Sequence, residues 1–220
     1  MAKAKICGIR SLEEAHWAID AGADAIGFIF VPRSKRYIQP EQAREISLKL
    51  PPFMTRIGVF VNEDPTIVLE IVQLCHLTAI QIHGTVAPED YQSIGVPCIK
   101  AINISVDDGI NSDQLEFQLP LKNWIGVVQG ILVDASYQGQ LGGTGSPLPW
   151  DDPSLQRLFN RIRGFDIPLI LAGGLTPDNI QRAIRVVEPY AVDVSSGVEC
   201  RGTKQQDLIK SFIEKAKEGR

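Results

Sequence analysis

Apolar runs and amphipathic stretches alternate along the whole chain. Eight short apolar runs are typical of buried strands, and they lie at residues 3–9, 25–31, 56–61, 78–82, 96–102, 130–135, 168–172 and 191–194. Stretches with the apolar spacing of a helix lie at residues 11–21, 40–50, 64–74, 88–93, 155–163, 177–187 and 206–217. This repeated alternation of strand and helix predicts a parallel (β/α)8 barrel.

Local signals support most of these elements, and one segment is weaker. Ser11, with Glu14 three residues later, forms the capping pattern that begins a helix, and Gly22 is placed to end that helix. Pro120 interrupts any helix through residues 105–126, so we expect a short or irregular fifth helix there. The glycine-rich stretch at residues 136–149 predicts a long loop that can move.

The composition fits one domain that spans residues 1–220. At 44% hydrophobic, the chain can bury one large core, and no linker or change of composition divides it. A net charge of −4 gives no overall basic field, so nucleic acid and anionic membranes are not expected as partners. The start has no apolar signal core, and no stretch approaches the roughly 18 apolar residues of a membrane span, so we expect a cytoplasmic protein.

The cysteines show no pairing pattern. Cys7, Cys75, Cys98 and Cys200 form no C-x-x-C motif, which argues against structural zinc and against a disulfide framework. All four are therefore expected to be free thiols. Cys75 and Cys98 fit the core, and Cys200 fits an incidental position.

Two neighbouring strands near the end of the chain stop at small residues. One apolar run ends in Gly173 and Gly174, and the next ends in Ser195, Ser196 and Gly197. Glycine lets the backbone N–H groups approach an anion, serine adds hydroxyl donors, and a helix that starts beyond each loop adds its positive end. In a (β/α)8 barrel the loops after the last two strands are a frequent phosphate site. We therefore predict a phosphate cup here, and the alternative is a pair of ordinary strand-to-helix turns.

In such a barrel the active site lies at the carboxyl ends of the strands. The polar or reactive residues predicted at these ends are Cys7, Arg36, Gln81, His83, Asp134 and Asp193. Cys7 is either a core thiol or, with cationic groups nearby, a thiol of lowered pKa that acts as a base. Asp134 is the one charged residue of an apolar run, and because unpaired buried charge is unfavourable it points to function. Asp193 either holds the phosphate loop or orients a neighbour.

Of the remaining polar candidates, one is suited to bind an anion and the others have no specific predicted role. Arg36 offers a planar, permanently charged fork for a carboxylate or phosphate, whereas Arg33 and Lys35 are expected in solvent. The alternative for Arg36 is a loop arginine without a partner. His83 has no second histidine near a strand end, so no metal site is predicted. No Walker loop or G-x-G-x-x-G motif supports a nucleotide or dinucleotide.

Taken together, the motifs resemble the phosphoribosylanthranilate isomerase family from end to end. They are K-I-C-G-I at 5–9, G-F-I-F-V-P-R-S-K-R-Y-I at 27–38, I-G-V-F-V at 57–61, Q-I-H-G at 81–84, L-V-D-A at 132–135, G-G-T-G at 142–145, L-A-G-G-L at 171–175 and V-D-V-S-S-G-V-E at 192–199. The chain departs from the family pattern at Leu148 and Pro149, at Pro120, and in E-C-R-G-T-K at 199–204. The first departure could change how the loop closes.

The resemblance implies an Amadori rearrangement in tryptophan biosynthesis, from N-(5-phosphoribosyl)anthranilate to 1-(2-carboxyphenylamino)-1-deoxyribulose 5-phosphate. It implies Asp134 as general acid and Cys7 as general base. Arg36 would hold the anthranilate carboxylate. The phosphate would be held by the two small-residue loops, and Asp193 is counted with these loops among the substrate-binding residues. No metal or organic cofactor is implied, because the nitrogen of the substrate is the electron sink.

Two other functions remain open from the sequence. A related phosphosugar isomerase of the histidine pathway is similar in its phosphate loops, but it pairs two aspartates, and Cys7 speaks against it. A non-catalytic phosphometabolite-binding protein is the second alternative, and the presence of both Cys7 and Asp134 speaks against that. The expected partner is a small phosphosugar-anthranilate molecule. A monomer is expected, with a dimer as the alternative.

Overall fold

The computed structural model describes residues 1–105, 121–137, 140–141 and 148–218. Eight parallel strands form its centre: β1 (Lys3–Cys7), β2 (Ala25–Ile29), β3 (Thr55–Val61), β4 (Ala79–His83), β5 (Cys98–Ser105), β6 (Gly130–Tyr137), β8 (Leu169–Leu171) and β9 (Ala191–Val194). Neighbouring strands follow the order β5-β4-β3-β2-β1-β9-β8-β6, and the pairing of β5 with β6 closes the ring. The predicted (β/α)8 barrel is confirmed.

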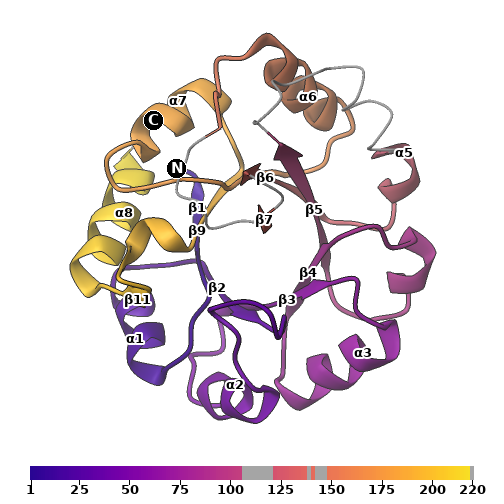
Figure 1. Cartoon of the computed structure of the whole chain (residues 1–220), viewed down its shortest axis with the longest axis vertical. Helices are drawn as coiled ribbons and strands as arrows, with labels where there is room; N and C mark the ends of the chain where they lie inside the picture. Colours follow the sequence, from indigo (N-terminus) through magenta and orange to yellow (C-terminus); the bar gives the residue numbers. More distant parts are fainter. Residues whose placement is uncertain (106–120, 138–139, 142–147, 219–220) are drawn as a thin grey trace.

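Helices surround this ring on the outside (Figure 1). They are α1 (Leu12–Asp20), α2 (Pro40–Ser47), α3 (Pro65–Leu74), α5 (Leu121–Trp124), α6 (Pro153–Gly164), α7 (Ile180–Val187) and α8 (Gln206–Glu218), with the 3₁₀ helix η1 (Pro88–Tyr91) after β4. Side-chain caps begin α1 and α3, and the one at Ser11 is the cap that the sequence indicates. The Ser11 hydroxyl accepts the N–H of Glu14 at α1, and the Asp64 carboxylate accepts the N–H of Thr66 at α3.

The structure differs from the sequence prediction at residues 88–93 and at the ends of several strands, and the short fifth helix is found as expected. The stretch predicted as a helix at residues 88–93 is only the 3₁₀ turn η1. Pro88 favours the start of a helical turn, but only Tyr91 of this turn is buried, so no apolar stripe extends it into a longer helix. The expected irregular fifth helix is the four-residue α5, while residues 106–120 lie outside the described part. Strand β6 runs two residues further than predicted and pairs with the antiparallel β7 (Gln140–Leu141).

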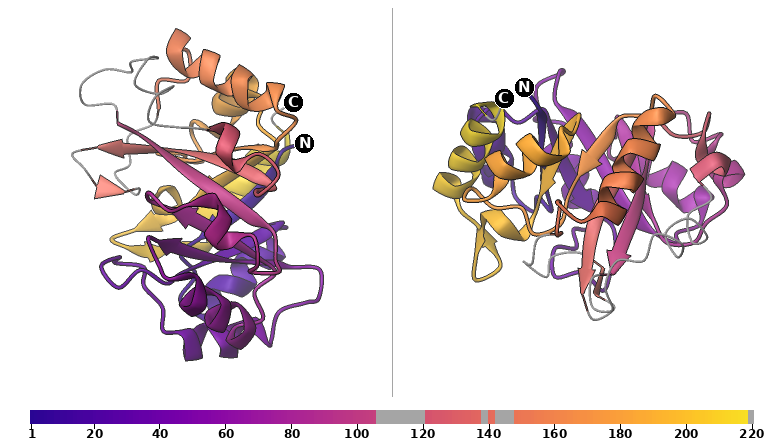
Figure 2. Two further views of the ribbon diagram at one scale, coloured as in Figure 1. Left: turned by 90° about the vertical axis from the view of Figure 1, so that its right-hand side faces the viewer. Right: turned by 90° about the horizontal axis from the view of Figure 1, so that it is seen from above.

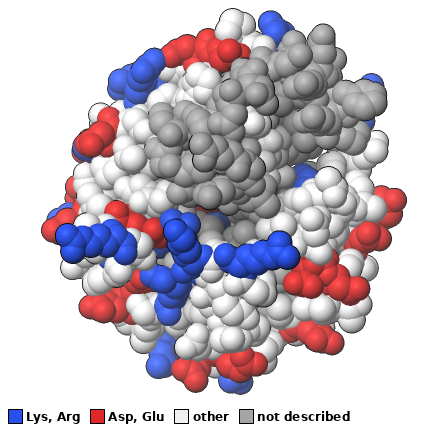
Figure 3. Space-filling view, in the orientation of Figure 1, with Lys and Arg blue, Asp and Glu red and all other residues white. Residues whose placement is uncertain are grey.

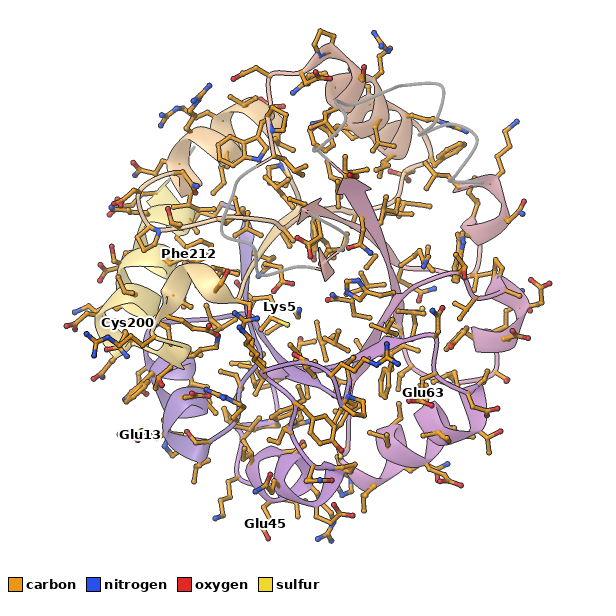
Figure 4. The ribbon with its side chains drawn as sticks, in the orientation of Figure 1. Lys5, Glu13, Glu45, Glu63, Cys200 and Phe212 are labelled. Carbon is orange, nitrogen blue, oxygen red and sulfur yellow. The ribbon has the colours of Figure 1, made fainter. Side chains whose placement is uncertain are left out.

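The core has an outer and an inner part. The outer part lies between the barrel wall and the helices and contains fully buried side chains such as Phe28, Phe60, Phe159 and Phe212. The inner part, inside the ring, consists mainly of small residues such as Ala101, Ala172 and Ala191. Polar groups share this inner space, and Figure 4 shows Lys5 in the middle of the ring, with Phe212 between α8 and the barrel.

A small antiparallel hairpin follows β9, and the sequence prediction did not include it. It consists of β10 (Glu199–Cys200) and β11 (Thr203–Lys204), and Glu199 pairs with Lys204 in its register. The two turn residues between these strands have positive φ angles, 51° at Arg201 and 78° at Gly202. The hairpin projects at the carboxyl ends of the strands, while the two chain termini lie at the other end (Figure 2).

The two ends of the barrel differ in character. A cavity of about 360 Å³ opens at the amino end, with the exposed Phe53 and Tyr190 among its lining residues. The candidate chemistry lies at the opposite, carboxyl end. No helix in the described residues has the length and apolar character that crossing a membrane requires.

Candidate active site

Cys7 ends strand β1 and points into the barrel mouth. Its side chain is buried, and Gly27 of β2 lies beside it in the strand register. A Cβ atom at Gly27 would stand 2.8 Å from the Cys7 sulfur, which is closer than real Cβ contacts allow. Glycine at this position therefore leaves the space that the thiol occupies.

Below Cys7, a buried ion pair crosses from β1 to β9. The Lys5 Nζ atom lies 2.8 Å from Asp193 Oδ2, and it also donates to Gln81 Oε1 at 2.9 Å. Lys5 and Asp193 are partners in the parallel register of these two strands. Within the described residues, Asp193 Oδ1 accepts no hydrogen bond. The side chain of Asp193 thus contacts Lys5, a neighbour that it orients, and keeps one acceptor for a ligand.

The pKa of the Cys7 thiol is raised above its ordinary value of 9.0. Burial is the main cause, and the charge of Lys5 pulls the pKa down without overcoming it. Of the two interpretations of Cys7 that the sequence left open, the thiol of lowered pKa is therefore not the one that the structure supports. The cations are present as expected, but the desolvation of the thiol outweighs them.

Asp134 is the residue for which the resemblance implies a general acid, and its pKa suits that role. It lies on β6, half-buried, and its pKa is raised to about 7 by burial and then by the charge of Asp193. A hydrogen bond from the backbone of Ala135 offsets part of this shift. A carboxyl group with this pKa keeps a large protonated fraction near neutral pH, which a general acid needs.

His83 is neutral and its protonated nitrogen can be assigned from its neighbours. Gln81 Oε1 accepts from Lys5, so the Gln81 amide nitrogen is the donor that lies 2.8 Å from His83 Nε2. His83 Nε2 is then the acceptor, and Nδ1 carries the hydrogen. Burial, with the charges of Lys100 and Lys5, lowers the pKa of His83 to about 3. Within the described residues, His83 Nδ1 and the buried Oδ1 atom of Asn103 have no partner with full hydrogen-bond geometry, but the Asn103 side chain lies close enough to offset part of the fall in the pKa of His83.

The two small-residue loops lie in direct contact. A Cβ atom at Gly197 would stand 1.8 Å from the carbonyl oxygen of Leu175, so only glycine allows this approach of the two backbones. Gly173 and Gly174 both have positive φ angles, 85° and 61°. A Cβ atom at Gly173 would stand 2.4 Å from the Ala135 nitrogen, which brings the first loop against the end of β6.

The second loop is joined to strand β1. The Ser195 hydroxyl donates to the Cys7 carbonyl oxygen at 3.1 Å, and Ser196 begins a single 3₁₀ turn, η2 (Ser196–Val198). Beyond the first loop, the Asn179 side chain donates to the Gly174 carbonyl and accepts the Thr176 N–H before α7 begins. The strand ends and loops that the sequence singled out are therefore brought together at one mouth.

Arg36 has a partner that the sequence analysis missed. Its Nε and Nη2 atoms donate to Glu199 Oε1 and Oε2 at 2.7 and 2.8 Å. Lys204 Nζ lies 3.0 Å from the same Glu199 Oε1 atom. Arg33 and Lys35 are exposed, as expected. The one available signal for this contact was that Glu199 closes the V-D-V-S-S-G-V-E motif and Lys204 follows five residues later.

A scan against family models matches residues 4–215 to the family described as N-(5'-phosphoribosyl)anthranilate (PRA) isomerase. The N-(5'-phosphoribosyl)anthranilate isomerase of Desulfitobacterium hafniense strain Y51 is 47% identical, over 99% of this chain and 98% of the relative. The crystal structure of phosphoribosyl anthranilate isomerase from Thermotoga maritima superposes with a TM-score of 0.84 at 42% identity, covering 99% of this chain and all of that chain. A crystal structure of this isomerase in complex with reduced 1-(o-carboxyphenylamino)-1-deoxyribulose 5-phosphate has a TM-score of 0.81, again at 42% identity, with the same coverage.

The buried neutral state of His83 predicts a specific acid sensitivity. A histidine in the unfolded chain has a pKa near 6.5, whereas His83 in the folded chain has one of about 3. Between these values the unfolded chain binds a proton that the folded chain does not, so stability falls as the pH falls, by up to about 1.4 kcal/mol per pH unit. In His83→Gln the free energy of unfolding in urea should fall less steeply between about pH 6 and pH 4.

The matched control is His16→Gln, which removes an exposed histidine of α1. It should keep the steep dependence of the wild-type chain. Equal slopes for His83→Gln and the wild type would show that His83 takes up its proton in the folded state.

Proposed function

This chain belongs to the N-(5'-phosphoribosyl)anthranilate isomerase family, and we propose that it catalyses the family reaction with Asp134 as general acid and Cys7 as general base. The reaction isomerises an aminoaldose to an aminoketose in tryptophan biosynthesis. Its product is 1-(o-carboxyphenylamino)-1-deoxyribulose 5-phosphate. The observation that carries the assignment of the acid is the pKa of Asp134, raised to about 7 at the barrel mouth.

The first step opens the ribose ring. Asp134 donates its proton to the ring oxygen as the bond between this oxygen and C1 breaks, and the substrate nitrogen supplies the electron pair that forms the C=N bond. The product of this step is a protonated imine with an open-chain sugar. The half-buried Asp134 carboxyl, with its pKa raised to about 7, keeps its proton against water near neutral pH and gives it to the more basic alkoxide that develops.

The second step removes the proton from C2. Cys7 takes this proton, and the C–H electron pair forms the C1=C2 bond while the C=N electrons return to nitrogen. The enolamine that results tautomerises to the ketone. Before ring opening the thiol of Cys7 is protonated, because burial raises its pKa. The imine nitrogen that becomes positive lies two bonds from C2, and its charge lowers the pKa of the adjacent thiol. The thiol then gives its own proton to solvent and becomes the thiolate that accepts the C2 proton.

Two anionic ends hold the sugar between these groups. The phosphate is assigned to the loops at Gly173–Gly174 and at 195–197, whose backbones are in contact. The anthranilate carboxylate is assigned to Arg36, and a sugar hydroxyl to the open Oδ1 acceptor of Asp193. Fixing both ends reduces the freedom that the sugar loses at the transition state. The nitrogen of the substrate is the electron sink, so this chemistry requires no cofactor.

We propose that the chain acts as a monomer in the cytoplasm. All the groups assigned above come from one barrel, and reducing conditions keep a thiol such as Cys7 free. The alternative is a dimer, because a relative from Thermotoga maritima is described as dimeric and Phe53 is 98% exposed beside the cavity at the amino end. Light scattering should give a mass near 24.2 kDa, and a doubled mass would establish the dimer. Immunoblotting of fractionated cells tests the location.

The acid and the base should respond differently to substitution. Asp134→Asn keeps the shape but carries no acidic proton, so kcat should fall by about 10² to 10⁴-fold while the product analogue still binds. Cys7→Ser should be nearly as inactive as Cys7→Ala, since a hydroxyl does not ionise near neutral pH. The assay follows the fluorescence decay of freshly made phosphoribosylanthranilate.

The matched controls are the exposed residues Asp178, replaced by Asn, and Cys200, replaced by Ala. Both should retain wild-type turnover. Near-normal turnover of Cys7→Ala would move the base to another group at the mouth. A pH profile of kcat/KM that lacks a limb near pH 7 in the wild type would remove the role of Asp134.

The phosphate assignment predicts a loss of binding. Ser196→Glu places a negative charge where the phosphate is expected, and Gly174→Val adds a branched side chain at a φ angle of 61°, so KM should rise strongly in both variants. Ser93→Glu adds the same charge at an exposed position and should leave KM unchanged. Thermal unfolding checks that the barrel is intact. An unchanged KM in Ser196→Glu would place the phosphate elsewhere.

A further inference from the structure

The guanidinium of Arg36 belongs to a buried triad of charges. Glu199 holds the edge formed by Nε and Nη2, at 2.7 and 2.8 Å, and Lys204 holds Glu199 at 3.0 Å. Only 6% of the Glu199 side chain and none of the Lys204 side chain is exposed. Both residues come from the β10–β11 hairpin, to which neither the sequence motifs nor the proposed reaction assigns a role.

We propose that Glu199 and Lys204 are positioning residues for the carboxylate of the substrate. Glu199 fixes the plane of the Arg36 guanidinium, and Lys204 keeps the triad positively charged. The inference rests on the proposed contact between Arg36 and this carboxylate. It extends that contact to two residues that do not touch the substrate.

The geometry leaves a second edge of Arg36 for the ligand. A guanidinium is planar and offers five N–H donors, so a carboxylate on the Nε–Nη2 edge leaves the terminal edge, Nη1 with Nη2, for another. Within the described part of the chain, Arg36 Nη1 makes no hydrogen bond. Because Glu199 holds one edge at two points, the direction of the terminal edge is set before a ligand arrives.

The stem of Arg36 and its loop are fixed as well. A Cβ atom at Gly8 would stand 2.7 Å from Arg36 Cδ, so the arginine lies over the backbone that follows Cys7. Arg10 joins the Arg36 loop to the hairpin, donating to the Lys35 carbonyl at 3.2 Å and to the Gly202 carbonyl at 2.8 Å. The guanidinium therefore has little freedom to turn toward solvent.

Lys204 makes the net charge of the Arg36–Glu199–Lys204 triad positive. Arg36 and Glu199 alone are neutral as a pair, and a neutral pair attracts a carboxylate weakly. Arg36 and Lys204 together outweigh burial and lower the pKa of Glu199, so Glu199 stays ionised. Burial lowers the pKa of Lys204, but its neighbours are two acceptors, the Glu199 carboxylate and the Ser195 carbonyl oxygen at 3.2 Å. These contacts favour the ammonium form and leave the triad with one net positive charge.

The experiment compares two ligands by calorimetry. One is reduced 1-(o-carboxyphenylamino)-1-deoxyribulose 5-phosphate, and the other is the same molecule without the carboxyl group. Glu199→Gln and Lys204→Met should each weaken binding of the first ligand roughly tenfold or more, as the loss of a charge-assisted contact predicts, and change binding of the second by less than about threefold. The KM of the substrate should rise with them, while kcat stays within about threefold of the wild-type value, because the acid and the base are untouched.

The outcomes separate three accounts. If net charge alone mattered, Glu199→Gln would tighten binding of the carboxylated ligand, since it removes a negative charge, and this result would overturn the positioning role. Equal losses for both ligands, together with a lowered melting temperature, would reduce the triad to a structural brace and also overturn it. Glu45→Gln and Lys49→Met make the same changes at exposed positions of the chain and should alter neither ligand.

The variant Arg36→Met distinguishes failure of the positioning proposal from failure of the proposed contact between Arg36 and the substrate carboxylate. If Arg36→Met discriminates between the two ligands and Glu199→Gln does not, only the positioning proposal fails. If Arg36→Met weakens both ligands equally, the contact with the carboxylate itself is wrong. In the double variant Arg36→Met/Glu199→Gln the loss should not exceed that of Arg36→Met alone, because Glu199 acts through Arg36.

Discussion

A lysine and an aspartate face each other inside the barrel, and the groups above them depend on this pair. Lys5 and Asp193 are register partners on β1 and β9, 2.8 Å apart and almost fully buried, where an unpaired charge would be strongly destabilising. The pair also acts on both reacting groups. Burial is the main cause of the raised pKa of Asp134 and of Cys7, and Asp193 raises both further while Lys5 lowers both, so one structural ion pair adjusts the proton affinity of the proposed acid and base. Stability and chemistry therefore share the same two side chains.

The chain carries a net charge of −4, yet the proposed substrate has two anionic ends. A chain with a negative net charge can still bind an anion where its positive side chains are gathered locally. On the face in Figure 3, several Lys and Arg side chains gather near the barrel mouth, and most acidic side chains lie toward the edge. Around Arg36 the positive and negative charges nearly cancel: the Glu199 carboxylate neutralises one positive charge, and the Lys204 ammonium leaves one net positive charge. Binding of the anion thus depends on where each charge is fixed, which the overall composition does not record.

The sequence predicted features that repeat and missed contacts that close over long distances. Strand β9 was predicted at its observed bounds, because a short apolar run between turn residues is a strong local signal. Asp134 and the small-residue loops were predicted as site candidates since every parallel strand of a barrel delivers its carboxyl end to one face. The contact of Arg36 with Glu199 spans 163 residues, and the hairpin that makes it has strands of only two residues, too short for any periodicity. The direction of the pKa shift of Cys7 could not be chosen from the sequence for a related reason, because the balance between burial and nearby charges depends on the packed neighbours.

The same electrostatics give the proposed reaction an order. Before the reaction the Cys7 thiol holds its proton, because its pKa is raised above 9.0, while Asp134, with a pKa of about 7, is partly protonated near neutral pH. In the proposed reaction the base is therefore unavailable until a positive charge forms beside it, and that charge forms when Asp134 gives its proton to the ring oxygen. The transfer leaves Asp134 negative and the substrate nitrogen positive, and the thiol near the positive nitrogen then gives its own proton to solvent. Ring opening has to precede removal of the C2 proton, and the buried thiol remains largely un-ionised until a substrate has reacted.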